Sequence, residues 1–319
     1  MTPLGSGSIG IGLYLHDLPP AEAAARLIAQ AVIVEEAGFD SATVAEHHAG
    51  FRSYLPNPVL AASWMLAATE RIWSGPNPLL LPLRNAAIVA EDLAWLDARF
   101  PGRVAAGFAA GYHEDDFTAL GFDDFEARGR TYGAQLIEVA AALRGDADGL
   151  LGRDFALAGR KGRPLPLAGA AGSKLAAQRA ARAGVGLLMD SMASADDLAR
   201  VASAFAEAGG DGPRVLGRRI WVGEPPLHLF EAQLAAYRSK GDAGSWMQSI
   251  TTDVLVRGSA DEVIEQVLEA ATTAGATVLA LRVHLPGLDP KMADDQIRRV
   301  GEEVLPALRG AFAAQLEDT

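Results

Sequence analysis

The chain has 319 residues, of which 50% are hydrophobic, and it carries a formal net charge of −12 with no cysteine. This length and apolar content suffice for one large core. The acidic balance argues against nucleic acid and anionic membranes as partners, because both need a basic footprint, and the lack of cysteine excludes disulfides and thiolate chemistry. We therefore expect a cytoplasmic protein that acts on a small-molecule substrate, with no membrane span.

Short apolar runs alternate with longer helical patterns along the whole chain, which is typical of βα units. The expected strands are residues 9–15, 41–45, 72–81, 103–109, 166–170, 185–189, 214–222 and 277–284. The expected helices are residues 20–37, 58–69, 85–99, 125–143, 259–274 and 290–308, with others entered at Ser173 and after residues 194–197. This pattern predicts one domain over residues 1–319 and favours a closed (β/α)8 TIM barrel over a doubly wound open sheet.

Two segments depart from the alternation. Residues 145–162, after the fourth strand and its helix, mix Gly, Asp and Arg without helical period and predict a loop insertion or short hairpin. Residues 225–256, after the seventh strand, predict a helix plus a connection that holds His228, Trp246 and Met247. This second segment is interpreted either as a lid over the substrate or as a surface insertion.

Catalytic groups of such a barrel lie in the loops that follow its strands. Glu46-His47-His48 follows the second strand, where a carboxylate beside two imidazoles can orient one ring and set its basicity near neutral pH. The alternative is that one histidine caps the next helix and the other packs under the loop. No metal site is expected, because adjacent histidines in an extended segment point to opposite faces.

Two further segments suggest a bound cofactor. The small-residue loop at 168–174 can hold a phosphate on its backbone N–H groups, with Arg128 as counter-charge, although Ser173 also fits an ordinary helix cap and Arg128 a solvated surface residue. Proline within the third run predicts a bulge or a cis bond at Asn77-Pro78 that supports a planar ring, unless the strand ends at Ser74.

The order and spacing of several motifs resemble the bacterial luciferase-like monooxygenases, flavin-dependent enzymes on a (β/α) barrel. The matching stretches are Ala45-Glu46-His47-His48, Leu55-Pro56-Asn57-Pro58, residues 79–84, Ala90-Glu91-Asp92-Leu93, Leu96-Asp97, Gly102-Arg103, Gly107 and Ala171-Gly172-Ser173. The resemblance implies that His47 is the catalytic base, with Glu46 and His48 supporting it. The residues that it implies for cofactor binding are Asn77, Pro78, Arg128, Gly172 and Ser173.

The chain departs from luciferase at three positions. Ala110 stands where luciferase has a second phosphate-binding arginine, Ala109 where it has a reactive cysteine, and Ala176 where it has a threonine of the phosphate loop. Phosphate binding is therefore expected to rely more on backbone N–H groups and on Lys174.

The resemblance implies an FMN-dependent monooxygenase that receives reduced FMN from a separate flavin reductase and uses O2, through a C4a-peroxyflavin, to oxidise a small organic substrate. It also implies a homodimer. One alternative is an F420-dependent oxidoreductase that transfers hydride without O2, although Glu-His-His favours FMN because F420-dependent members more often have Asp-His there. The other is a non-catalytic flavin-binding subunit.

Overall fold

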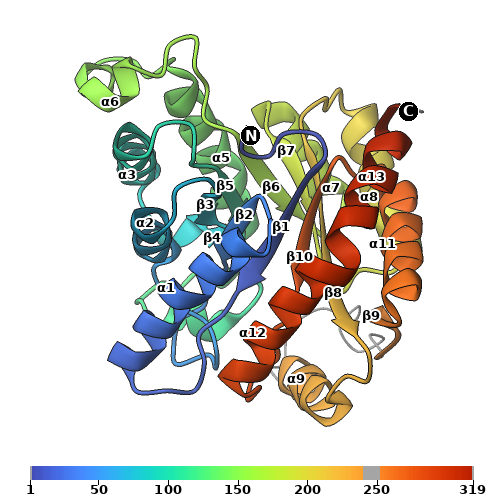
Figure 1. The fold of residues 1–319 in the computed structure, drawn as a ribbon. Coiled ribbons are helices and arrows are strands. Elements are labelled where there is room, and N and C mark those ends of the chain that lie inside the picture. Colours follow the sequence, from blue (N-terminus) through green and yellow to red (C-terminus); the bar gives the residue numbers. More distant parts are fainter. Residues whose placement is uncertain (1, 240–251, 318–319) are drawn as a thin grey trace.

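The computed structural model describes residues 2–239 and 252–317, and its parallel strands form a central barrel surrounded by helices (Figure 1). Neighbouring strands follow the order β3-β2-β1-β10-β8-β7-β6-β5-β4. Their bounds are β1 Ser8–Leu13, β2 Ser41–Val44, β3 Trp73–Pro76, β4 Leu79–Leu80, β5 Ala106–Ala109, β6 Leu167–Ala171, β7 Gly186–Met189, β8 Arg214–Val222, β9 Leu255–Gly258 and β10 Val278–Arg282.

The two ends of this strand order, β3 and β4, belong to the third predicted strand, which the structure divides in two. β4 pairs with β5, while Ser74 of β3 bridges to Val104, so the strands form a nearly closed barrel. The predicted (β/α)8 barrel is confirmed. The run at 72–81 is divided where its prolines indicate an irregularity, because the segment at Asn77 and Pro78 leaves the ladder and proline has no N–H to donate to it. The alternative that the strand ends at Ser74 was wrong, since β3 continues to Pro76.

Helices pack around the outside of the barrel (Figure 1). Their bounds are α1 Pro20–Glu36, α2 Pro58–Ala68, α3 Ala86–Arg99, α4 Glu114–Thr118, α5 Arg128–Arg144, α6 Phe155–Ala158, α7 Lys174–Ala183, α8 Ala195–Glu207, α9 Leu227–Ser239, α11 Ala260–Ala274, α12 Pro290–Arg299 and α13 Leu305–Glu317. Polar residues start many of them: Asn57 caps α2, Ser194 caps α8, and Ser259 with Glu262 forms a capping box on α11. These caps fix where each helix begins after the preceding loop.

Side chains alternate along the strands between two apolar layers. One layer, with Ile9, Phe108 and Leu216, packs between the barrel and the helices. The other lies inside the barrel, where Ala105, Ala168 and Ala280 pack with the larger Trp73, Leu188 and Val215. Ala280 also borders a cavity at the mouth of the barrel.

Glycines allow neighbouring strands of the barrel to approach each other closely. At Gly10 an added Cβ would lie 1.8 Å from the Ser41 hydroxyl oxygen, and at Gly75 it would lie 1.7 Å from the Ala105 carbonyl oxygen. Both contacts are far below van der Waals distance. The close approach of these strands therefore requires glycine.

The insertion at 145–162 contains two short helical turns, Leu151–Arg153 and α6, rather than a hairpin. Asp154 accepts hydrogen bonds from the N–H groups of Ala156 and Leu157 and so starts α6. Figure 1 shows α6 at the end of the barrel opposite to α9. The insertion therefore lies away from the carboxyl ends of the strands.

Two other elements differ from expectation. β9 was not predicted, because its apolar run is short, and it pairs with β8 outside the barrel order. The last predicted helix continues to Glu317 through a π-helical turn at Val300–Val304; Pro306 lacks an N–H, which a widened turn accommodates. Within the described ranges, no helix is long and apolar enough to cross a membrane.

Candidate functional site

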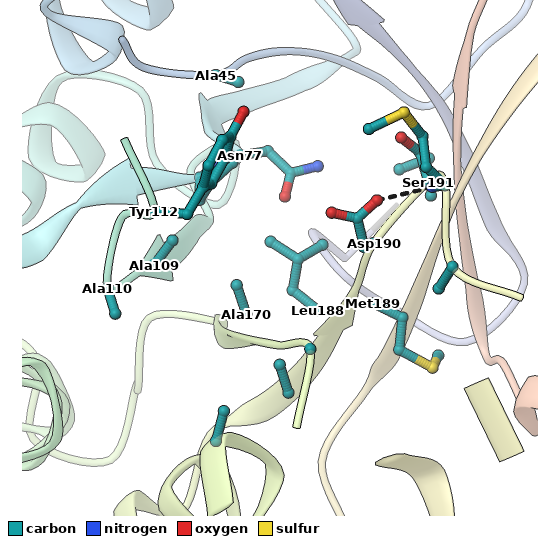
Figure 2. Close-up of a pocket in the computed structure, with 18 of the residues that line it drawn as sticks. Ala45, Asn77, Ala109, Ala110, Tyr112, Ala170, Leu188, Met189, Asp190 and Ser191 are labelled. Atoms are coloured by element: carbon teal, nitrogen blue, oxygen red, sulfur yellow. Dashed lines mark hydrogen bonds between the residues drawn. The ribbon is translucent and has the colours of Figure 1, made fainter. Parts of the chain in front are cut away.

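A cavity of about 320 Å³ opens at the carboxyl ends of the strands. Its walls come from residues that follow β2, β3, β5, β6 and β7 and from the ends of β8 and β10. In Figure 2 the side chains of Asn77 and Asp190 point into the same space from opposite sides. The structure therefore places the cavity where catalytic groups of a barrel are expected.

His47 follows β2 and lines the cavity with only 6% of its surface exposed. Its Nδ1 lies 2.7 Å from Oδ2 of Asp116, and its Nε2 lies 3.2 Å from the hydroxyl oxygen of Tyr112. An ionised carboxylate accepts hydrogen bonds only, so Nδ1 carries the proton of the neutral ring. Nε2 therefore offers its lone pair on the side of Tyr112, which also lines the cavity.

Asp116 lies in α4 and is fully buried. Its Oδ1 accepts the backbone N–H of His48 at 2.6 Å. Burial by itself would raise the pKa of Asp116, but the hydrogen bond and charge of His47 and the bond from His48 lower the pKa below its usual value. Asp116 therefore stays ionised at neutral pH and holds the His47 ring in one orientation.

Glu46 also borders the cavity, but its buried carboxylate is occupied by other groups. Oε1 accepts from Nε2 of His48 at 2.6 Å and from Nη1 of Arg84, and Oε2 accepts the backbone N–H of Leu80 at 2.7 Å. His48 is not among the residues that line the cavity. This arrangement fits the supporting role expected for Glu46 and His48, since it ties the end of β2 to β4.

The Asn77-Pro78 peptide bond is cis, one of the two geometries expected from the sequence. Both residues line the cavity. The Asn77 N–H donates to the Val44 carbonyl at 2.7 Å, and the Pro78 carbonyl accepts from the N–H of Glu46 at 3.1 Å. The segment is thus fixed to the end of β2, beside His47.

The small-residue loop between β6 and α7 starts that helix and also borders the cavity. Oγ of Ser173 accepts the N–H of Ala176 at 3.3 Å and caps α7, and the Ser173 side chain is not among those that line the cavity. Gly172 does line it, and an added Cβ there would meet no atom within 4 Å. The loop therefore presents open backbone to the cavity at the positive end of the α7 dipole.

Arg128 lies behind the cavity wall and does not line it. Its guanidinium donates to the carbonyls of Gly111 at 3.2 Å and Phe125 at 2.9 Å, and lies 3.7 Å from the centre of the Phe125 ring. In this structure the side chain supports the loop after β5. Its part in phosphate binding stays a prediction.

Ala109, Ala110 and Ala176, the three departures from luciferase, all line the cavity. The wall at these positions is therefore apolar and carries no side-chain counter-charge.

The predicted lid is described only in part. Tyr237 of α9 lines the cavity, whereas His228 on the same helix is exposed to solvent. Figure 1 shows α9 at the carboxyl ends of the strands. Trp246 and Met247 lie outside the described residues.

Three arginines line the cavity that the sequence did not indicate: Arg200 of α8, Arg219 of β8 and Arg282 of β10. The last two lie inside their strands, whereas the predicted site residues follow strand ends. The available signal was Arg218-Arg219 within an otherwise apolar run, because a charged residue in a barrel strand near its carboxyl end is expected to face the mouth.

Two further histidines are packed near the cavity. The His284 ring stacks on Tyr14 with ring centres 5.1 Å apart and meets His16 edge-on at 4.7 Å. Burial, reinforced by the charges of His16 and Arg219, lowers the pKa of His284 well below its usual value, and burial also lowers the pKa of His16. Both rings are therefore neutral at pH 7.

The fold and the cavity at its mouth define the class as a (β/α)8-barrel enzyme. Residues 9–225 match a family described as luciferase-like monooxygenases, and the chain belongs to that family. The resemblance found in the sequence is confirmed.

Two curated relatives and one solved structure illustrate the range of the family. Over 106 residues the chain is 34% identical to the alkanal monooxygenase alpha chain of Photorhabdus laumondii subsp. laumondii. This match covers 33% of this chain and 30% of that protein. Over 201 residues it is 32% identical to an F420-dependent glucose-6-phosphate dehydrogenase of Nocardia farcinica, which covers 59% and 58%. The chain thus matches under two thirds of either relative.

The solved structure is the oxygenating constituent of 3,6-diketocamphane monooxygenase from Pseudomonas putida, in complex with FMN. It has a TM-score of 0.75, 18% sequence identity, and coverage of 94% of this chain and 98% of that one. This likeness concerns the fold.

Proposed function

We propose that this protein is an FMN-dependent monooxygenase that uses reduced FMN and O2 to transfer one oxygen atom to a small organic substrate and release the other as water. The observation that carries the proposal is the hydrogen-bonded series Asp116, His47 and Tyr112 at the cavity. An imidazole held in this way can act as a general base or acid toward a group in the cavity. Membership of the luciferase-like monooxygenase family supplies the class of chemistry.

The residues around the cavity fit a phosphorylated flavin. The open backbone at Gly172 and the start of α7 would hold the phosphate, while Asn77 and Pro78 would contact the ring. Bound reduced flavin supplies the electrons that activate O2.

The chain's own contribution is proton control and exclusion of water. His47 would accept or donate a proton at Nε2, with the Tyr112 hydroxyl between it and the cavity. Asp116 would stabilise the imidazolium, as a buried carboxylate does for a histidine base in other enzymes. The apolar walls at Ala109 and Ala110 would keep water away from the reacting atoms.

A second candidate is F420-dependent hydride transfer, which the similarity to the Nocardia farcinica enzyme favours. The deciding experiment is anaerobic titration of the purified chain with oxidised FMN, reduced FMN and F420, followed by exposure of each complex to O2. Tight binding of reduced FMN with rapid O2 consumption supports the monooxygenase. Selective binding of F420 without O2 consumption would replace it with the hydride-transfer enzyme.

The role of His47 is tested by His47→Ala. We expect FMN to bind with unchanged affinity and turnover to fall by about 10²-fold or more, the usual contribution of a general base. His228→Ala, at an exposed position on α9, is the matched control and should retain full turnover. Equal turnover in both variants would remove His47 from the mechanism, and no turnover by the parent chain would favour a non-catalytic flavin-binding subunit.

We further propose that a separate flavin reductase delivers the reduced FMN. The chain with FMN and NADH alone should then oxidise no NADH, and addition of a reductase should start O2 consumption. NADH oxidation by the chain alone would contradict this division of labour.

We also propose that the chain forms a homodimer. Large apolar side chains are exposed on one side, at Trp95 of α3 (53% exposed) and Phe155 of α6 (86%). Nε1 of Trp95 donates to Oδ2 of Asp154 at 3.0 Å. Because Asp154 directly precedes Phe155, Trp95 and Phe155 belong to one surface. Exposed apolar patches of this kind mark interaction surfaces.

A further inference from the structure

Arg219 is the least expected group in the cavity wall. It lies on the same face of β8 as Gly217, which also lines the cavity, and only 1% of it is exposed. Its Nε and Nη1 have no hydrogen-bond partner among the described residues. A guanidinium remains charged in proteins, so unsatisfied buried donors on it are costly.

A second arginine stands beside it. Arg282 on β10 pairs in register with Arg219 on β8, and it also lines the cavity. Its Nη1 donates to the hydroxyl oxygen of Tyr14 at 2.7 Å. Like charges directly opposite on neighbouring strands repel each other, so the pair calls for an anion.

Among the described residues, no carboxylate oxygen lies within 4.0 Å of a basic nitrogen of either arginine, and the negative charge of Asp190 acts on both only from a greater distance. Of the carboxylates that line the cavity, Glu46 is bonded to Arg84 and His48, and Asp197 to Arg200. The third, Asp190, accepts the N–H of Met192 at 2.7 Å.

The neighbouring phenols do not supply the charge either. The hydroxyl oxygens of Tyr54 and Tyr237 lie 2.8 Å apart, and both residues line the cavity. Burial raises the pKa of both phenols. They therefore stay neutral and form an uncharged aromatic wall.

Tyr54 of this wall connects the arginines to His47, through Tyr14 behind it. Tyr14, which bonds Arg282, meets Tyr54 edge-on with ring centres 5.1 Å apart, and Tyr54 meets the His47 ring edge-on at 4.5 Å. A molecule held at the arginines would lie along this wall with its far end toward His47.

We propose that Arg219 and Arg282 form a subsite for the carboxylate of an organic acid substrate, whose apolar body packs on Tyr54 and Tyr237. A planar guanidinium fork matches a carboxylate through paired hydrogen bonds. The assignment of a substrate rests on the proposed monooxygenase function, whose reaction would take place at the other end of the molecule. It adds that the substrate is an organic acid.

The test uses benzoate as probe and benzyl alcohol as its uncharged counterpart, with binding to the full chain measured by calorimetry, both without cofactor and with oxidised FMN. We expect Arg219→Gln and Arg282→Gln to weaken benzoate binding by about 10- to 100-fold and to leave benzyl alcohol unchanged. Arg200→Gln, at a cavity residue already paired with Asp197, is the matched control and should bind benzoate like the parent. Equal benzoate affinity in Arg219→Gln and the parent would overturn the subsite.

A second variant at Arg219 separates loss of benzoate binding from loss of folding stability. Arg219→Met removes a buried charge that forms no ion pair within 4.0 Å among the described residues, so its Tm should be at least that of the parent while benzoate binding is lost. A lower Tm would indicate a structural arginine and contradict the proposal. If inorganic phosphate binds more tightly than benzoate and displaces it, the subsite is assigned to a phosphate group instead of a carboxylate.

Failure of the subsite and failure of the proposed function give different results. Arginine-dependent benzoate binding without FMN binding leaves the subsite and removes the monooxygenase. If the chain binds FMN and consumes O2 but binds benzoate independently of the arginines, the monooxygenase stands and the subsite is removed. If Arg219→Gln weakens binding of reduced FMN more than that of oxidised FMN, the arginine serves the cofactor and the substrate assignment falls.

Discussion

The orientation of the His47 ring depends on a residue far from it in the sequence. Asp116 is 69 positions away and contributes one oxygen to the His47 ring and the other to the backbone of His48. The pair therefore fixes both the orientation of the imidazole and the conformation of the chain after β2. Glu46, which looked like the natural partner of the histidine, is bonded elsewhere.

Asp116→Asn tests the first of these functions. The amide cannot stabilise an imidazolium as a carboxylate does, so we expect turnover to fall by about 10²-fold or more and its pH profile to shift, with FMN affinity retained. Asp115→Asn, at the neighbouring position with its side chain 66% exposed, is the control and should leave turnover unchanged. An unaltered pH profile in Asp116→Asn would show that Asp116 does not act through His47.

His284 predicts a stability effect between pH 7 and pH 5. The unfolded chain protonates its histidines near pH 6.5, whereas folded His284 remains neutral to much lower pH. The unfolded state therefore binds more protons as the pH falls, and the free energy of unfolding decreases by up to about 1.4 kcal/mol per pH unit for each such histidine.

In His284→Phe this dependence should become shallower, as measured by urea unfolding at pH 7, 6 and 5. The lowered pKa of Asp116 acts below this range and does not interfere. A slope equal to that of the parent would show that His284 is protonated in the folded protein.

At the scale of elements, close packing of the strands requires positions without a side chain. β3 approaches β5 so closely that Gly75 has no space for a Cβ beside Ala105. This contact lies where the interrupted third strand closes the barrel. Gly75 therefore allows the close approach of β3 and β5 at this point.

Gly75→Ala should lower the free energy of unfolding by about 1–3 kcal/mol, as overpacking does in a dense core. Gly310→Ala is the matched control, because Gly310 is exposed in α13 and an added Cβ there meets no atom within 4 Å. It should raise the free energy of unfolding by about 0.5–1 kcal/mol through helix propensity. Chemical denaturation of both variants decides, and an equally stable Gly75→Ala would contradict the role given to this contact.

The sequence predicts most elements because apolar runs and capping residues are local signals. Pro78 likewise marked the break in the third strand, but its bulge and cis alternatives differ only in tertiary structure. The bond between His47 and Asp116 joins segments from different loops, and the direction of Arg219 depends on strand register. Both are properties of the assembled barrel, so local patterns did not reveal them.

At the scale of the whole molecule, the two ends of the barrel differ in character. The carboxyl ends of the strands carry the cavity and α9, while α6 lies at the other end (Figure 1). Arg160 of the insertion, buried beside Asp97 of α3 at 2.8 Å, holds that segment against the barrel. The apolar surface of α3 and α6 is thus separate from the site of chemistry.

Phe155→Glu should weaken self-association by at least about tenfold, because a charge would have to be buried in an apolar contact. Sedimentation velocity over a range of concentrations measures this, with Met292→Glu on α12 as a control that should behave like the parent. A parent chain that sediments as a monomer at every concentration would exclude the homodimer.

The small residues inside the barrel have a consequence for the range of ligands. The inner face of the cavity is formed at Ala170, Gly217 and Ala280 by side chains with at most one carbon. A larger side chain at Ala170 or Ala280 would fill part of the cavity, whereas at Gly217 an added Cβ would lie only 3.1 Å from Ser191. We therefore expect these two alanines to set how long a ligand the cavity accepts.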